Sequence, residues 1–156
     1  DARKQFPMIS LDIYGQGGED NKLREVIKEL KAETFVKLKG HSNQISQVYP
    51  NYDAFISGSY SEGFGLTYIE ALDAGLPIVT FKARFGALEL VKDGVNGYLK
   101  DFSRTDEEYS REQLKEGILQ LLKANHQEIV NNTRISVRDY QDSIIANQWK
   151  ELINGL

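Results

Sequence analysis

The chain has 156 residues, of which 13 are Gly, 3 are Pro and none is Cys, and its net charge is −4. This length predicts one domain with a sizeable core, and the absence of Cys excludes a disulfide scaffold, thiolate metal sites and a Cys nucleophile. The acidic balance argues against a general nucleic-acid binder, because such proteins normally carry a basic excess.

Strands alternate with helices in the first part of the chain. Period-2 apolar character predicts a strand at 8–14, and helical spacing of apolar residues predicts a helix at about 19–31. A second strand is expected at 34–38, followed by a short helix or turn at 43–50. A third strand at 54–57 is nearly all apolar, as buried parallel strands are.

The second part of the chain begins with a glycine-rich loop, Gly58 to Gly65. The helix expected at about 65–74 ends at Gly75, because a glycine and a nearby proline (here Pro77) are a common stop signal. The remaining expected elements are a fourth strand at 77–81, a loop at 82–86, a short helix at 87–92, a fifth strand at 98–99, an amphipathic helix around 114–122 and a last helix around 145–153.

This alternation predicts an α/β fold, a Rossmann-like doubly wound parallel sheet. Such sheets bind ligands beyond the carboxyl ends of their strands, where loops meet helix N-termini. The loop that ends at Gly65 is therefore the first place to look for a binding site.

The residues of this loop suit a phosphate and a sugar. Gly63 and Gly65 flank Phe64 just before a helix, so backbone N–H groups and the helix dipole can meet an anion. Glu62 and Glu70 stand on either side, and a carboxylate accepts hydrogen bonds from paired hydroxyls. The alternative is a surface loop in which the glutamates have structural roles and the helix is merely capped.

Glu62 and Glu70 are separated by seven residues within the segment SEGFGLTYIEALDAGLPIV. This segment resembles the E-x7-E signature of retaining glycosyltransferases of family 4, which have the GT-B fold of two Rossmann-like lobes. Residues 93–99 resemble the family's next block, and Glu89 falls on its usual upstream glutamate. The loop at 81–89 is more similar to the branch that glucosylates wall teichoic acid or attaches N-acetylglucosamine to serine-rich bacterial adhesins.

The resemblance implies roles for individual residues. Glu62 would be the catalytic residue, in contact with a hydroxyl of the transferred sugar, and Glu70 would hold the ribose hydroxyls of a nucleotide-sugar donor. The other implied donor contacts are the backbone of Gly63, Phe64 and Gly65 at the sugar, of Leu66 and Thr67 at the diphosphate, of Gly40 and His41 at the base, and the side chain of Arg84 from its loop. For Arg84 the alternative is an exposed side chain on a surface turn.

The resemblance further implies a hexosyltransferase that moves sugar from UDP-glucose or UDP-N-acetylglucosamine to a hydroxyl of a polymer or protein. Anomeric configuration would be retained, and no metal or other cofactor would be required. The sequence agrees with this, since it has no D-x-D motif and its two His, His41 and His126, lack metal-binding spacing.

Four other functions are alternatives to this one. A non-catalytic pseudo-glycosyltransferase that stabilises a partner subunit and a nucleotide-sugar epimerase on the same scaffold both stay open. A glycosidase pair of Glu62 and Glu70 is disfavoured, because hydrolysis needs no glycine cradle between the carboxylates. An NAD site at 15–18 is disfavoured because the third glycine of that fingerprint is misplaced.

The expected organisation is one lobe of a larger enzyme. Residues 1–130 would form the donor-binding domain without its first strand, and 131–156 a terminal helix that packs on an absent N-terminal, acceptor-binding domain. The family's phosphate-gripping Arg and Lys follow that first strand, and Arg3 and Lys4 do not match their context. We therefore expect this piece alone to be inactive.

No apolar run approaches the roughly 18 residues of a membrane span, and the segment 1–6 is not a signal peptide. We expect a cytoplasmic bacterial protein that binds no nucleic acid. Peripheral membrane association is open for the full-length protein.

Overall fold

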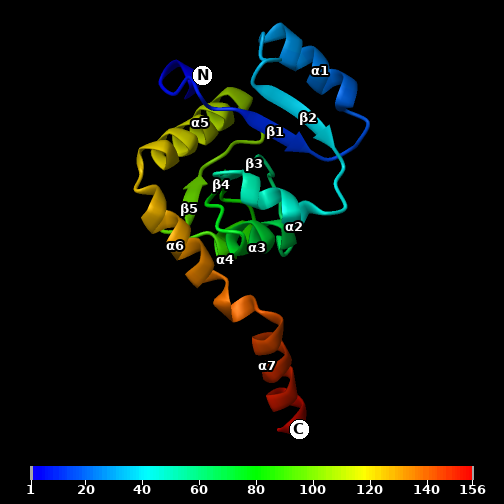
Figure 1. Cartoon of the computed structure of the whole chain (residues 1–156), viewed down its shortest axis with the longest axis vertical. Coiled ribbons are helices and arrows are strands. Elements are labelled where there is room, and N and C mark those ends of the chain that lie inside the picture. Colours follow the sequence, from blue (N-terminus) through cyan, green and yellow to red (C-terminus); the bar gives the residue numbers. More distant parts are fainter. Residues whose placement is uncertain (1, 156) are drawn as a thin grey trace. The chain divides into compact units, whose positions relative to one another are not determined.

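The computed structural model describes residues 2–155, and these form two compact units that are divided between Ile45 and Ser46. Helices and parallel strands alternate along the chain, as the sequence predicts, so the predicted Rossmann-like α/β class is confirmed (Figure 1). The strands are β1 (Leu11–Tyr14), β2 (Val36–Gly40), β3 (Phe55–Ser57), β4 (Ile78–Phe81) and β5 (Gly97–Lys100). The α-helices are α1 (Asp20–Glu29), α2 (Ile45–Val48), α3 (Leu66–Asp73), α4 (Gly86–Leu90), α5 (Glu107–Lys123), α6 (His126–Ser136) and α7 (Asp142–Asn154).

The first unit contains a two-stranded parallel sheet, in which β1 pairs with β2 and α1 connects them. α1 carries the predicted apolar stripe, yet none of its residues is buried. Leu23 and Val26 on that stripe are 37% and 41% exposed. The apolar face of this helix is therefore only partly covered.

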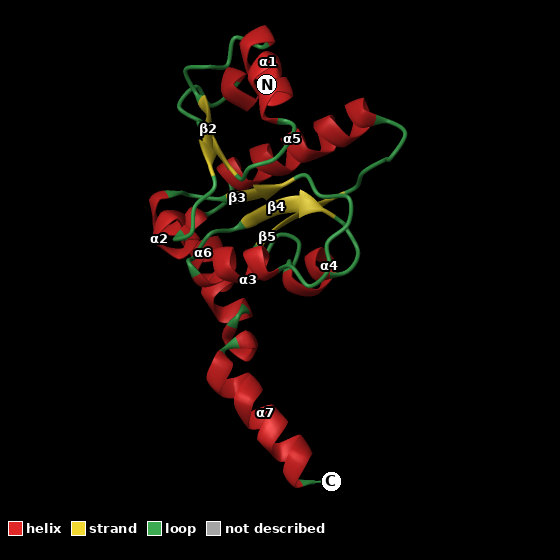
Figure 2. Cartoon of the chain, turned by 90° about the vertical axis from the view of Figure 1, so that its right-hand side faces the viewer, coloured by secondary structure: helices red, strands yellow, loops and turns green. Residues whose placement is uncertain are grey.

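The second unit contains a three-stranded parallel sheet in the order β3-β4-β5. The central strand β4 is buried along its whole length. α5 packs against one face of the sheet, and α3 and α4 lie on the other (Figure 2). Val79 of β4 packs with Leu121 of α5 and Ile129 of α6 in the core between sheet and helices. This packing is the usual way in which a parallel sheet is shielded from water on both faces.

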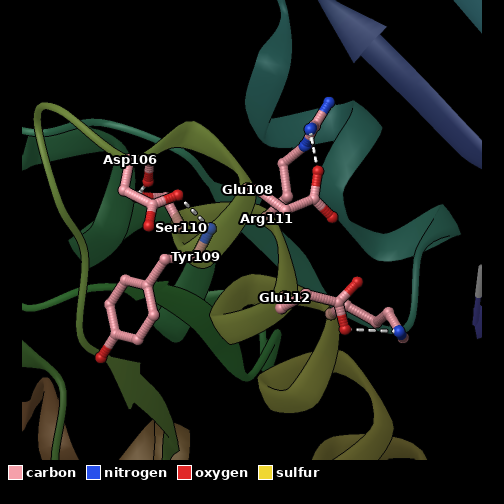
Figure 3. Close-up of polar contacts among 7 residues, drawn as sticks. Asp106, Glu108, Tyr109, Ser110, Arg111 and Glu112 are labelled. Atoms are coloured by element: carbon pink, nitrogen blue, oxygen red, sulfur yellow. Dashed lines mark hydrogen bonds and ion pairs between the residues drawn. The ribbon is translucent and has the colours of Figure 1, made fainter.

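α5 begins where Asp106 caps it, because the Asp106 carboxylate accepts a hydrogen bond of 2.9 Å from the Tyr109 backbone N–H (Figure 3). Two ion pairs along the next turns, Glu108 with Arg111 and Glu112 with Lys115, lie on its exposed side. The last residues of the polar stretch at 101–110 therefore form the first turn of α5.

The C-terminal part contains one helix that the sequence analysis missed. We predicted an amphipathic helix around 114–122 and a last helix around 145–153, which are α5 and α7, but α6 lies between them. The Asn125 side chain caps α6. The buried residues of α6 are Ile129 and Thr133. None of the residues of α7 is buried, and Leu156 lies outside the described residues. None of the described helices is both long and apolar enough to cross a membrane.

Gly97 offers a test of the β4–β5 pairing. A β-carbon on Gly97 would stand 2.1 Å from the carbonyl oxygen of Ile78, and a backbone neighbour cannot move aside cheaply. We expect Gly97→Ala to lower the free energy of unfolding by about 1–3 kcal/mol, as overpacking usually does. Chemical denaturation measures this, with Gly58→Ala as the control, since nothing lies within 4 Å of a β-carbon there. Equal stability of the two variants would contradict the pairing.

Candidate functional site

The glycine-rich loop and the loop after β4 meet at one edge of the sheet. The first follows the carboxyl end of β3 and the second that of β4, and these strands are parallel neighbours. Three backbone hydrogen bonds join the loops: Glu62 N–H to Arg84 O (2.8 Å), Phe85 N–H to Glu62 O (2.6 Å) and Gly86 N–H to Gly63 O (3.0 Å). This is the edge at which doubly wound sheets bind their ligands.

Two glycines make the close approach of the loops feasible. Gly65 adopts φ +83°, the left-handed conformation that favours glycine, directly before the first residue of α3. A β-carbon on Gly86 would lie 2.3 Å from the carbonyl oxygen of Phe64, so only glycine fits there. The loop backbone from Gly63 to Gly65 is thereby fixed on both sides.

α3 presents its N-terminus at this loop without a side-chain cap among the described residues. Its first turn also holds no acidic residue. The backbone N–H groups of Leu66 and Thr67 belong to the turn in which helical N–H groups have no intrahelical acceptor. An anion is a suitable partner for them, because it also interacts favourably with the helix dipole.

Tyr60 anchors the start of the loop from the other side. Its ring stacks against those of Phe81 and Phe102, with centroid distances of 5.5 and 5.1 Å, and the Phe81 and Phe102 rings are themselves 5.5 Å apart, so the three rings form one cluster. Phe81 ends β4 and Phe102 follows β5, so the stack ties the loop to both strands. The Arg104 guanidinium donates a further hydrogen bond of 3.2 Å to the Tyr60 carbonyl oxygen.

The two glutamates of the signature differ in their surroundings. Glu62 is half-buried at the loop pairing, and Glu70 is exposed on α3. The buried Tyr49 hydroxyl donates a long hydrogen bond of 3.5 Å to Glu70 Oε2 and lies equally far from the carbonyl oxygen of Thr67. Burial, with the negative charge and hydrogen bond of Glu70, raises the pKa of Tyr49 to about 12. Tyr49 therefore donates to Glu70 at any physiological pH.

The predicted site residues fall into two groups. Those in the second unit lie together on the paired loops and on α3; they are Glu62, Gly63, Phe64, Gly65, Leu66, Thr67, Glu70 and Arg84. Gly40 and His41 lie in the first unit, at the end of β2 and just beyond it. Gly40 has φ +70° and accepts a hydrogen bond from Gly15 N–H, and His41 Nε2 is 2.7 Å from Asn43 Oδ1.

Sequence reasoning missed three residues that shape the site: Tyr49, Gly86 and Tyr140. Tyr49 lies far from Glu70 in the sequence, and nothing in the pattern connects the two. Only Gly86 carried a usable signal, since it is the last residue of the predicted loop at 82–86 and stands directly before a predicted short helix. Within residues 2–155, no group of three or more His, Cys, Asp and Glu side chains is arranged to hold a metal ion.

A family model described as glycosyl transferases group 1 matches residues 1–136. The chain belongs to this family. The assignment confirms the resemblance that rests on the E-x7-E segment. The solved structures to which this group 1 chain is similar are GT-B glycosyltransferases, which confirms the fold prediction at that level as well.

The relatives fall in the branch that the loop at 81–89 indicated. The chain is 36% identical to the UDP-N-acetylglucosamine–peptide N-acetylglucosaminyltransferase GtfA subunit of Streptococcus pneumoniae, over 98% of its own length and 31% of the relative's. It is 33% identical to the poly(glycerol-phosphate) alpha-glucosyltransferase of Bacillus subtilis, over 98% of its length and 22% of the relative's. Both relatives are therefore far longer than this chain.

Nearly the whole of this chain is similar to part of a solved structure, that of the pneumococcal O-GlcNAc transferase GtfA in complex with UDP and GlcNAc. Its TM-score is 0.91 at 35% sequence identity, and the match covers 99% of this chain and 31% of that one. The group 1 chain thus has the fold of one continuous part of a larger transferase.

The raised pKa of Tyr49 predicts how stability depends on pH. An unfolded tyrosine loses its proton near pH 10, whereas folded Tyr49 keeps it to about pH 12. The folded state then binds more protons, so the free energy of unfolding falls as pH rises through this window. We expect wild type to lose stability relative to Tyr49→Phe between about pH 10 and 12, and chemical denaturation at several pH values measures this.

Glu70→Gln is the matched control for that experiment. Its neutral side chain removes one cause of the raised pKa, so the pH-dependent difference between wild type and Tyr49→Phe should shrink in that background. Parallel stability curves for wild type and Tyr49→Phe would contradict the raised pKa of Tyr49, and an undiminished difference in the Glu70→Gln background would contradict the contact between Tyr49 and Glu70.

Proposed function

We propose that the chain is the donor-binding lobe of a retaining glycosyltransferase that uses UDP-glucose or UDP-N-acetylglucosamine. The observation that carries this proposal is the glycine-rich loop, fixed by backbone pairing and flanked by Glu62 and Glu70 at the N-terminus of α3. Membership in the group 1 family supports it. So does the similarity to a transferase whose structure contains UDP and GlcNAc.

The backbone of the loop suits the diphosphate of such a donor. When the glycosidic bond breaks, negative charge grows on the leaving diphosphate, and dipoles already aimed at it stabilise the transition state. In this proposal the N–H groups of Leu66 and Thr67 face the diphosphate and those of Gly63, Phe64 and Gly65 face the sugar. Because the loop is held by the segment 84–86, these dipoles need little reorganisation during the reaction.

The glutamates would hold the two sugar rings of the donor. Glu70 would accept hydrogen bonds from the ribose hydroxyls, and its contact with Tyr49 restricts its orientation. Glu62 would contact a hydroxyl of the transferred sugar. Gly40 and His41 would meet the base, and Arg84 would approach the donor from its loop.

The acceptor and the rest of the enzyme lie outside this chain in the proposal. The chain spans about a third of the length of its pneumococcal relative. In the proposal a separate acceptor-binding domain binds the glycopolymer or protein whose hydroxyl receives the sugar. α7 exposes Trp149, Leu152 and Ile153, each more than half accessible, and in the proposal this face packs on that domain.

Donor binding can be measured on the chain itself. We expect UDP to bind in calorimetry and Glu70→Gln to weaken it about tenfold or more, because a hydrogen bond to a charged group contributes about 1.5–3 kcal/mol. Asp73→Asn on the same helix is the control and should leave the affinity unchanged. The proposal fails for this chain if millimolar UDP gives no binding signal.

The reaction needs the full-length protein. We expect it to transfer sugar from UDP-glucose or UDP-N-acetylglucosamine, with α-configured donor giving α-configured product, while the 156-residue chain alone gives no transfer. Proton NMR of the anomeric signal reports the configuration. A β-linked product would contradict retention, and an altered free sugar nucleotide would favour the epimerase.

A further inference from the structure

Tyr140 lies between two parts of the candidate site that are distant from it in sequence. Its ring meets the Phe64 ring edge to face, with centroids 6.2 Å apart and planes at 65°. Its hydroxyl also interacts with the Glu89 carboxylate of α4. Burial, together with the charge and hydrogen bond of Glu89, raises the pKa of Tyr140, so the hydroxyl keeps its proton and donates to the carboxylate.

The segment that carries Tyr140 is firmly attached to the rest of the unit. Tyr140 ends a short 3-10 helix, Arg138–Tyr140, and its N–H bonds to the carbonyl oxygen of Val137 at 3.0 Å. Val137 is only 2% exposed. Just before it, Ser136 Oγ accepts a hydrogen bond of 2.9 Å from the buried Asn96 side chain. The backbone that carries Tyr140 is therefore held in place by its buried neighbours, and so is the position from which its side chain reaches the loops.

Phe64 and Glu89 stand on the two chain segments that form the site. Phe64 lies between Gly63 and Gly65 near the end of the glycine-rich loop, and Glu89 lies one turn into α4, whose first residue Gly86 bonds to Gly63. The Phe64 side chain is 55% exposed, so its ring has few other neighbours to fix it. Tyr140 touches both segments beyond the point at which their backbones pair.

We propose that Tyr140 is a positioning residue, which holds the Phe64 segment of the glycine-rich loop and the Glu89 carboxylate in one arrangement. This rests on the proposed function in one respect, namely that the loop between Gly63 and Gly65 faces the donor's sugar. Tyr140 then acts on the sugar end of the site through Phe64 and Glu89. The UDP end, at α3 and Glu70, does not depend on it.

The contact itself can be tested without ligand. In NMR spectra of the full chain, we expect nuclear Overhauser contacts between the Tyr140 and Phe64 rings. Tyr140→Leu should shift the amide signals of Gly63 and Gly65 while leaving those of Leu99 and Lys100 in β5 unchanged. Tyr109→Leu on α5 is the control, and it should leave the amide signals of Gly63 and Gly65 unchanged. Absent ring contacts, or unshifted glycine signals, would overturn the proposal whether or not UDP binds.

The role in binding is tested with Tyr140→Phe, which keeps the ring and removes only the hydroxyl. We expect this substitution to weaken the binding of UDP-glucose or UDP-N-acetylglucosamine, whichever the wild-type chain binds, about tenfold. This is the effect of one hydrogen bond to a charged group. The affinity for UDP alone should change less than about twofold. In a Glu89→Gln background the same substitution should have little further effect, since the two residues act as one unit.

The outcomes separate the two proposals. If the wild-type chain binds neither UDP nor a UDP-sugar, the proposed function fails for this chain, and the NMR experiment still decides the contact. If Tyr140→Phe weakens UDP and UDP-sugar equally, or if its effect simply multiplies with that of Glu89→Gln, Tyr140 is a general structural residue and the inference is wrong. A thermal melt of each variant establishes that it is folded.

Discussion

The pairing of two loop backbones after neighbouring parallel strands is the constraint on which the site depends. Glu62 and Gly63 bond to the segment 84–86 through main-chain atoms alone. Buried or crowded backbone groups need partners, and here each loop supplies those of the other. The side chains of Glu62 and Arg84 are consequently not required for the pairing and remain available to a ligand.

Aromatic side chains hold this pair of loops and α3 against the sheet. Tyr60 stacks on the ends of the sheet strands, as described above. Under α3, Phe55 of β3 lies edge-on to both Tyr49 and Tyr68, and the Tyr68 hydroxyl is 3.0 Å from Thr80 Oγ1 of β4. Offset and edge-to-face ring pairs add about 0.5–1.5 kcal/mol each beyond burial. The same rings that form the core thus also orient Glu70, because Tyr49 belongs to both.

The sequence predicts the part of this arrangement that is encoded locally. Alternating strands and helices follow from apolar periodicity and from glycine and proline stops, and the two glutamates lie within one short segment. α6 escaped prediction because its buried residues, Ile129 and Thr133, are too few to form a clear apolar stripe. Tyr49, Gly86 and Tyr140 escaped because each acts through a contact between distant parts of the chain. Gly86 is needed only because Phe64 approaches it, and that approach is a property of the folded loops.

The acidic balance of the chain is compatible with an anion site once its construction is considered. The net charge of the chain is −4, and salt screens exposed charges beyond about 8–10 Å. At the loop itself the first turn of α3 carries no acid, and the donors are backbone N–H groups at a helix N-terminus. Such dipoles bring no net charge and are fixed by the fold. The local field at Leu66 and Thr67, and not the overall charge, therefore decides whether a diphosphate is attracted there.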